Sequence, residues 1–182
     1  MIETRTATAT GGQEPEIAPQ RHRHRLHIGR RAALGLIKNH SPDALRVIDA
    51  RISASFAAQG LMATVSAKID RIEPGRVILS APITPGVSQQ SGFVHAGLTF
   101  ALGDSAAGYA ALTGFALDTE VVTTEMKINL LAPAQGKRLI AEGRVVRAGK
   151  RLTVVGAEVY AQGAGPRIHV ATLLGSMMPL KA

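Results

Sequence analysis

The sequence predicts an α+β fold in which a curved antiparallel sheet wraps around one long central helix. The helix is indicated by the run from His95 to Leu117, which is rich in Ala, Gly, Leu and Phe and carries a single formal charge. Two β-branched segments precede this run and four follow it, with short turn sequences between them. Short turns favour antiparallel pairing, and a sheet buries its apolar face against a helix.

Length and composition fit one domain. The chain has 182 residues, of which 46% are hydrophobic, enough for a sizeable core. We assign this domain to residues 41–182 and interpret residues 1–40 as a basic N-terminal extension, disordered over its polar, aperiodic start. The net charge of +8 is spread along the chain, so no dense basic patch dominates the domain. No signal peptide is recognisable, which favours a cytoplasmic protein.

The segment before the central helix predicts helix first and then strand. Ala32 to Lys38 suits a short helix, and Ser41-Pro42-Asp43 is typical of a new helix start. Apolar residues then recur at helical spacing as far as Gln59-Gly60, where the glycine suits a left-handed cap. Two strands are predicted next, Leu61 to Ile72 and Arg76 to Ala81, joined through a turn at Glu73-Pro74-Gly75; a loop from Pro82 to Phe93 leads to the central helix.

Four β-branched segments follow the central helix, with turn residues between the last three. Because consecutive strands with short turns usually pair with their sequence neighbours, we expect a four-stranded antiparallel meander. The expected strands are Val121 to Leu131, Leu139 to Arg147, Leu152 to Ala161 and Arg167 to Leu174.

Asp104 is the charge within the central helix, and it is the first candidate for chemistry. An ionised carboxylate in apolar surroundings is costly, and carboxylates kept there cluster at reacting centres, where desolvation raises their basicity. The start of the same helix offers a second chemical feature. Free backbone N–H groups at Ala96 and Gly97 carry the positive end of the helix dipole and could hold an oxyanion.

Four stretches resemble the phenylacetate-degradation (PaaI) branch of hotdog-fold acyl-CoA thioesterases. They are Gln89 to Gly97, Leu102 to Ala111 and Val122 to Ala134, continued by Gly143 to Lys150. The resemblance covers roughly Val47 to Met178 and implies a hotdog fold, hydrolysis of an acyl-CoA to a free acid and coenzyme A, and no cofactor, since coenzyme A is part of the substrate. Where the family usually has His-Gly-Gly, this chain has His95-Ala96-Gly97.

By motif position, the resemblance implies that Asp104 is the catalytic acid, as general base or as nucleophile. It implies an oxyanion hole at Ala96 or Gly97, a helper hydroxyl at Thr123 and a polar site residue at Gln89. Period-two alternation instead leaves Thr123 on the polar face of its strand and puts Thr124 on the apolar face, an order that a bulge could change. We interpret His95 chiefly as a residue that packs or hydrogen-bonds at the helix entrance.

Helix geometry indicates that one chain does not complete the site. Seven residues separate Gly97 from Asp104, which places them on one face but roughly 10 Å apart along the axis. A base must act within roughly 3 Å of the reacting atom, so the acid and the amides are expected to come from two central helices. The sequence therefore predicts a homodimer with interfacial sites, and the resemblance adds a dimer of dimers.

Further residues are candidates for substrate binding or for alternative functions. His95, Asn129 and the cations Arg147, Lys150 and Arg151 are candidate substrate contacts, the cations for coenzyme A phosphates. Arginines alternate with the histidines of residues 21–27, so no metal site is expected. Two alternatives stay open: an acyl-CoA sensor that contacts nucleic acid through its basic tail, and a hotdog dehydratase that uses His95.

Overall fold

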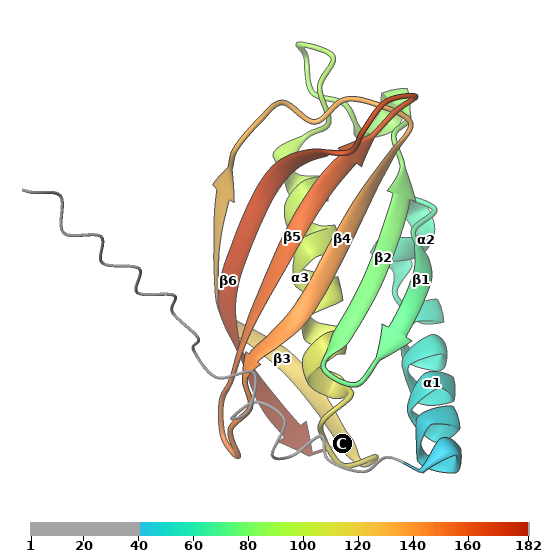
Figure 1. The fold of residues 1–182 in the computed structure, drawn as a ribbon, viewed down its shortest axis with the longest axis vertical. Coiled ribbons are helices and arrows are strands. Elements are labelled where there is room, and N and C mark those ends of the chain that lie inside the picture. Colours follow the sequence, from blue (N-terminus) through green and yellow to red (C-terminus); the bar gives the residue numbers. More distant parts are fainter. Residues whose placement is uncertain (1–40, 182) are drawn as a thin grey trace, which may run out of the picture.

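The computed structural model describes residues 41–181, and it confirms the predicted fold class. One six-stranded antiparallel sheet curves around helix α3 (Figure 1). The sheet order is β1-β2-β4-β5-β6-β3. The elements are α1 Pro42–Ala57, α2 Gly60–Thr64, β1 Lys68–Glu73, β2 Arg76–Pro82, the 3-10 turn η2 Pro85–Val87, α3 Ala96–Leu112, β3 Thr119–Leu130, β4 Arg138–Arg147, β5 Thr153–Gln162 and β6 Ile168–Lys181.

The predictions for residues 1–40, namely the disordered start, the basic segment and the short helix at Ala32 to Lys38, lie outside the described residues. The domain boundary at residue 41 accordingly stays a prediction.

Helix α3 is buried against the concave face of the sheet because its residues are small and apolar. Eleven of its 17 residues are buried, including Leu102, Ala106 and Ala110. The closest approach is at Gly143 of β4, where a Cβ atom would lie 2.1 Å from the carbonyl carbon of Ala106. The helix ends at Leu112, five residues before the predicted end, and a tight turn follows in which Phe115 N donates to the Leu112 carbonyl.

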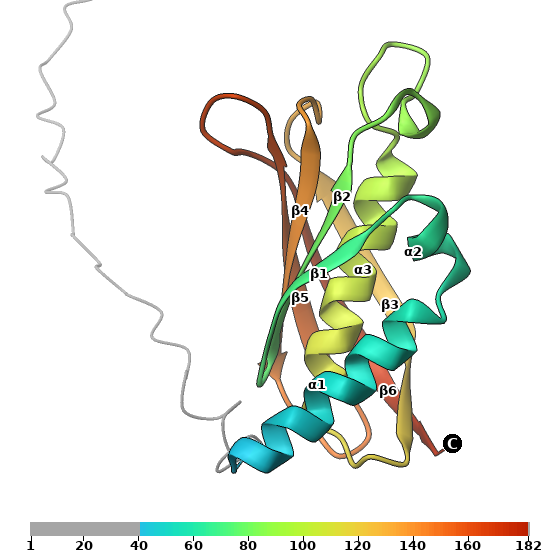
Figure 2. The same cartoon turned by 90° about the vertical axis from the view of Figure 1, so that its right-hand side faces the viewer.

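The N-terminal part confirms one prediction and corrects two. Helix α1 begins as expected, with the Ser41 side chain accepting a hydrogen bond from Ala44 N, and it crosses α3 (Figure 2). Gly60 is not a left-handed cap, and the strand predicted from Leu61 is wrong over its first residues, because Gly60 opens α2. This short helix buries Met62 in the core, and the chain enters β1 only at Lys68.

The β1–β2 hairpin forms as predicted, with Gly75 in the turn at φ 75°. The predicted four-stranded meander is wrong in its first member. Strands β4, β5 and β6 do pair in sequence, but β3 pairs with β6. After β3 the chain crosses the end of the sheet, where Leu131 N donates to Val170 O and Lys137 N donates to Gln162 O, before it enters β4. Strand β3 therefore forms one edge of the sheet.

Candidate active site

The first half of the candidate site is a cavity of about 280 Å³ beside Asp104. Asp104 lies near the middle of α3 and is partly buried. Burial raises the pKa of its carboxyl group, and a hydrogen bond from Thr123 opposes this rise. A carboxylate held in this way is more basic than a solvated one and keeps one fixed donor. The cavity wall is formed by α1, the α1–α2 junction, α3, β3 and β6, and its residues are Ser55, Gln59, Asp104, Ser105, Gly108, Tyr109, Leu112, Glu120, Val121, Thr123 and Met177.

A β-bulge brings the Thr123 hydroxyl to the carboxylate. The pairing of β3 with β6 shifts register between Thr123 and Glu125, so simple alternation fails there. The Thr123 hydroxyl donates to Asp104 Oδ1 at 2.8 Å, whereas the Thr124 hydroxyl donates to the Ser176 carbonyl at 3.1 Å. The alternation predicted from the sequence is therefore wrong at Thr123, and the position indicated by the family motif is the one that meets the acid.

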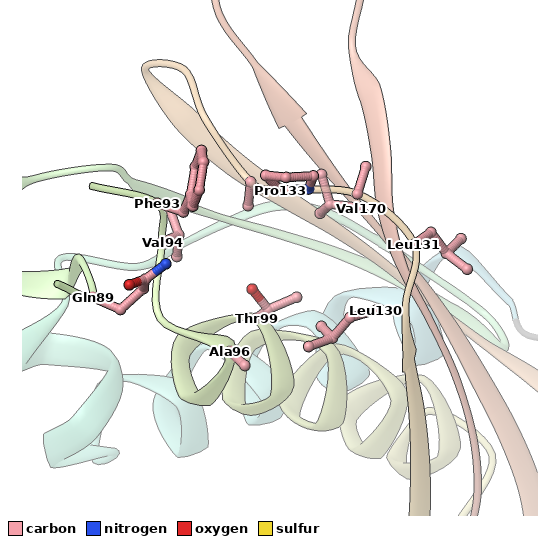
Figure 3. A pocket seen from close by; sticks show the side chains of 11 residues that line it. Gln89, Phe93, Val94, Ala96, Thr99, Leu130, Leu131, Pro133 and Val170 are labelled. Atoms are coloured by element: carbon pink, nitrogen blue, oxygen red, sulfur yellow. The ribbon is translucent and has the colours of Figure 1, made fainter. Parts of the chain in front are cut away.

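The second half of the candidate site lies at the start of α3. Here a cavity of about 380 Å³ is bounded by Gln89, Ala96 and Thr99 and by the segment after β3 that includes Pro133 (Figure 3). Ala96 is the first helical residue, and its N–H donates to no partner within residues 41–181. The amide of Ala96 therefore remains available to an oxyanion.

Gly97 differs from the expectation of a free amide. Its N–H donates to Nδ1 of His95 at 2.9 Å, so the imidazole caps the helix. This contact confirms the hydrogen-bonding role expected of His95 at the helix entrance. Gly97 also lines a different cavity from Ala96, one shared with His95, Leu61 and Val65. The geometry thus favours Ala96 over Gly97 as the oxyanion donor.

Gln89 lies at the mouth of the cavity beside Ala96. Its Oε1 accepts a hydrogen bond from the backbone N–H of Ser91 at 2.6 Å, which orders the loop. Gln89 therefore combines the two roles that sequence reasoning left open, a cavity-lining residue and a loop residue.

Within one chain the two halves do not meet. Eight residues separate Ala96 from Asp104, which corresponds to roughly 12 Å along the helix axis. The two cavities have no lining residue in common. A thioester carbonyl held at Ala96 is therefore out of reach of the Asp104 carboxylate of the same chain.

The other predicted substrate contacts lie outside these two cavities. Asn129 is exposed on β3, paired with Thr172 of β6. Arg147, Lys150 and Arg151 are exposed where β4 and β5 connect. Lys150 lines a small cavity with Ala111 and Phe115, at the C-terminal end of α3. Within one chain this cation cluster is therefore far from Ala96, at the other end of the helix.

Sequence reasoning assigned no site role to five polar residues that line the Asp104 cavity: Ser55, Gln59, Ser105, Tyr109 and Glu120. Gln59 Nε2 donates to the Tyr109 hydroxyl at 2.7 Å, and the Ser55 hydroxyl lies 3.3 Å from it. One signal was available, because Tyr109 is one of two tyrosines in the chain and stands in a mostly apolar helix. The contribution of α1 depends on how that helix crosses α3, which no local pattern shows.

Comparison with known proteins gives the family. The family model of the thioesterase superfamily matches residues 91–166 of this chain. A crystal structure of a thioesterase family protein from Silicibacter pomeroyi is 40% identical, with a TM-score of 0.73, over 74% of this chain and 99% of that one. Two Saccharolobus solfataricus proteins described as esterases are 35% and 33% identical, and the chain spans 64% and 63% of their lengths.

Two further solved structures are similar. The PaaI protein from the phenylacetic acid degradation operon of E. coli is 20% identical, with a TM-score of 0.68, over 75% of this chain and 96% of that one. A Bacillus halodurans protein crystallised with CoA is 27% identical, with a TM-score of 0.60, over 80% of this chain and 95% of that one. None of the helices in residues 41–181 has the length and apolar character needed to span a bilayer. The chain belongs to the thioesterase superfamily and has the hotdog fold of the PaaI-type members.

Proposed function

We propose that this protein hydrolyses an acyl-CoA thioester to a free acid and coenzyme A, with Asp104 as the acid that activates the attack. The observation that carries the proposal is the hydrogen bond of 2.8 Å between Thr123 and a partly buried Asp104 of raised pKa, inside a cavity. Membership of the thioesterase superfamily and the similarity to a structure crystallised with CoA support the same substrate class.

In the proposed reaction the thioester carbonyl oxygen accepts a hydrogen bond from the Ala96 amide. As general base, Asp104 removes a proton from water, and the water oxygen bonds to the carbonyl carbon. The carbon–sulfur bond then breaks, and the leaving thiolate takes up the proton held by Asp104, which releases coenzyme A as the thiol and restores the carboxylate. As nucleophile, Asp104 would attack the carbon itself and expel the thiolate of coenzyme A to form an anhydride, which water then hydrolyses to the free acid and the regenerated carboxylate. Both routes need the ionised carboxylate, and the Thr123 hydroxyl orients it in either case.

We propose that each site forms between two copies of the chain, with Ala96 from one protomer and Asp104 from its partner. The separation of the two groups within one chain requires this arrangement for a single carbonyl to meet both. Strand β3 supports it, because this edge strand of 12 residues exposes Val122 and Leu130 and has one side that pairs with no other strand of residues 41–181, so that a second copy can cover it. Thr123 lies on this strand, so dimerisation along β3 closes the Asp104 cavity.

The cations Arg147, Lys150 and Arg151 remain our candidates for the phosphates of coenzyme A, and the exposed Asn129 and His95 remain candidate substrate contacts. A dimer of dimers likewise stays a prediction.

The test is thiol release from a panel of acyl-CoA esters by the wild type, Asp104→Asn and Asp118→Asn. Asp118 is a matched control, since its carboxylate is exposed and contacts Thr119. We expect Asp104→Asn to fold and to lose about 10²- to 10⁴-fold in kcat, as the loss of a general base does. Asp118→Asn is expected to keep its activity. Absence of thiol release by the wild type on every ester would refute the proposed function.

A further inference from the structure

The Asp104 cavity has a polar end at Tyr109, five residues further along α3. The Tyr109 side chain is buried, with a relative exposure of 4%, and its ring packs edge-on against Phe56 of α1. The phenol oxygen accepts the Gln59 amide N–H at 2.7 Å. A phenol has one proton of its own to donate as well.

Within residues 41–181, the proton of the Tyr109 hydroxyl has one long hydrogen-bond partner. The Ser55 hydroxyl is 3.3 Å away, longer than the usual O–H···O range of about 2.5–3.0 Å. Burial, together with the nearby charge of Glu120, raises the pKa of Tyr109, so the phenol stays protonated. A buried donor that opens into a cavity and lacks a short hydrogen bond is suited to an acceptor atom on a ligand.

The charges around the cavity restrict that ligand. Its described lining residues include two carboxylates, Asp104 and Glu120, and no lysine or arginine. A second carboxylate on the acyl group would meet like charges without a counterion. These charges favour a neutral oxygen, a hydroxyl or a carbonyl, as the ligand group at the phenol.

We propose that Tyr109, held by Gln59 of the α1–α2 junction, forms a specificity site for acyl groups that carry a neutral oxygen at their far end. This inference rests on the proposed thioesterase function. Gln59 and α1 lie outside residues 91–166, the part matched by the superfamily. Gln59 acts as a positioning residue because it fixes the phenol oxygen and leaves the phenol proton for the substrate.

The spacing of Asp104 and Tyr109 along α3 guides the length of the probe. Five residues along α3 correspond to about 7.5 Å, and carbon–carbon bonds of about 1.5 Å in zigzag need about six bonds to cover that distance. The matching probe is 6-hydroxyhexanoyl-CoA. Hexanoyl-CoA lacks the terminal oxygen, and adipoyl-CoA replaces it with a carboxylate.

The experiment measures kcat/KM for these three esters in the wild type, Tyr109→Phe, Gln59→Leu and Tyr160→Phe. Tyr160 is a matched control, because it stacks on His169 and Arg167 in a different part of the molecule. We expect the wild type to favour 6-hydroxyhexanoyl-CoA over hexanoyl-CoA by about fivefold to tenfold, the effect of one net hydrogen bond, and to disfavour adipoyl-CoA. Tyr109→Phe should bring the first ratio to about one, Gln59→Leu should lower it, and Tyr160→Phe should leave it unchanged.

A wild type that favours hexanoyl-CoA or adipoyl-CoA would overturn the specificity site while the thioesterase function stands. A folded Tyr109→Phe that keeps the wild-type ratio of kcat/KM values would also overturn the specificity site. If Tyr109→Phe does not fold, an unchanged ratio in Gln59→Leu overturns it. No hydrolysis of any of the three esters, nor of the wider acyl panel, would remove the proposed function and the specificity site with it.

Discussion

Replacing Thr123 with valine is the sharpest single perturbation of the candidate site. Valine keeps the shape of threonine and removes the hydroxyl that donates to Asp104 Oδ1 at 2.8 Å. That hydrogen bond lowers the pKa of Asp104, against the burial that raises it. Without the bond the pKa rises further, so the carboxylate becomes protonated at a higher pH. Because catalysis needs the ionised form, the acid limb of the pH–rate profile must move to higher pH.

The size of this shift follows from the hydrogen bond. A bond to a charged group contributes about 1.5–3 kcal/mol, and we take the lower end because solvent reaches part of the carboxylate. At about 1.4 kcal/mol per pH unit, the acid limb of kcat/KM moves up by about one pH unit. At high pH, where the carboxylate is fully ionised, Thr123→Val loses less of its rate than Asp104→Asn does, because the base itself remains.

The assay is thiol release from one good acyl-CoA substrate between about pH 4 and pH 9. Thr124→Val is the matched control, because the Thr124 hydroxyl donates to the Ser176 carbonyl and not to the acid. We expect its profile to superimpose on that of the wild type. A Thr123→Val enzyme that is folded and active, with an acid limb at the wild-type pH, would refute the role assigned to Thr123. It would also refute the assignment of the acid limb to the titration of Asp104.

Two further predictions concern stability. The pKa of Asp104 is raised in the folded protein. Above the ordinary carboxyl pKa, the folded protein therefore binds more protons than the unfolded chain does. The ionised carboxylate then costs stability, so the free energy of unfolding falls as pH rises. Asp104→Asn should therefore have a higher Tm than the wild type at pH 8, and the difference should disappear below about pH 4. A lower Tm than the wild type at pH 8 would contradict the desolvation argument. Gly143→Ala places a methyl group 2.1 Å from the α3 backbone and should lower the free energy of unfolding, measured by urea titration, by about 3 kcal/mol. Gly60→Ala is the control: its methyl group meets open space, so the free energy of unfolding should stay within about 0.5 kcal/mol of the wild type.

The central helix and most strands were predictable because their signals are local. The apolar run at α3 and the Pro74-Gly75 turn specify their structures within a few residues. The partner of β3 was not predictable in this way. Pairing with β6 depends on how the chain between β3 and β4 crosses the end of the sheet, a long-range property that short-turn rules do not contain. Helix α2 formed where a strand was expected because one helical turn buries Met62.

The candidate site likewise combines features that the local sequence predicts with features that depend on the three-dimensional structure. Asp104 and the helix start stand out in the sequence as the charge within an apolar run and the residues that open that run. The face of Thr123 depends on a bulge, which shifts alternation by one residue and leaves no mark in the strand sequence. The capping of Gly97 by His95 depends on the side-chain conformation of the imidazole, so the availability of Ala96 in place of Gly97 became visible only in three dimensions.

The shared site between two protomers is the central claim, and two complementary variants can test it. Asp104→Asn removes the acid. Ala96→Pro removes the amide proton of the oxyanion donor, and proline suits the first position of a helix. His95 has φ −62° and ψ 135°, an extended conformation that is compatible with a following proline. Each variant alone should be folded by circular dichroism and inactive as a homodimer.

The decisive measurement is the activity of a purified heterodimer that carries Asp104→Asn in one protomer and Ala96→Pro in the other. If each site takes Ala96 from one chain and Asp104 from its partner, one of the two sites in this heterodimer keeps both groups. The account predicts about half of the wild-type kcat, because a two-fold symmetric dimer has two equal sites. A heterodimer as inactive as its two parents would contradict a site shared between protomers.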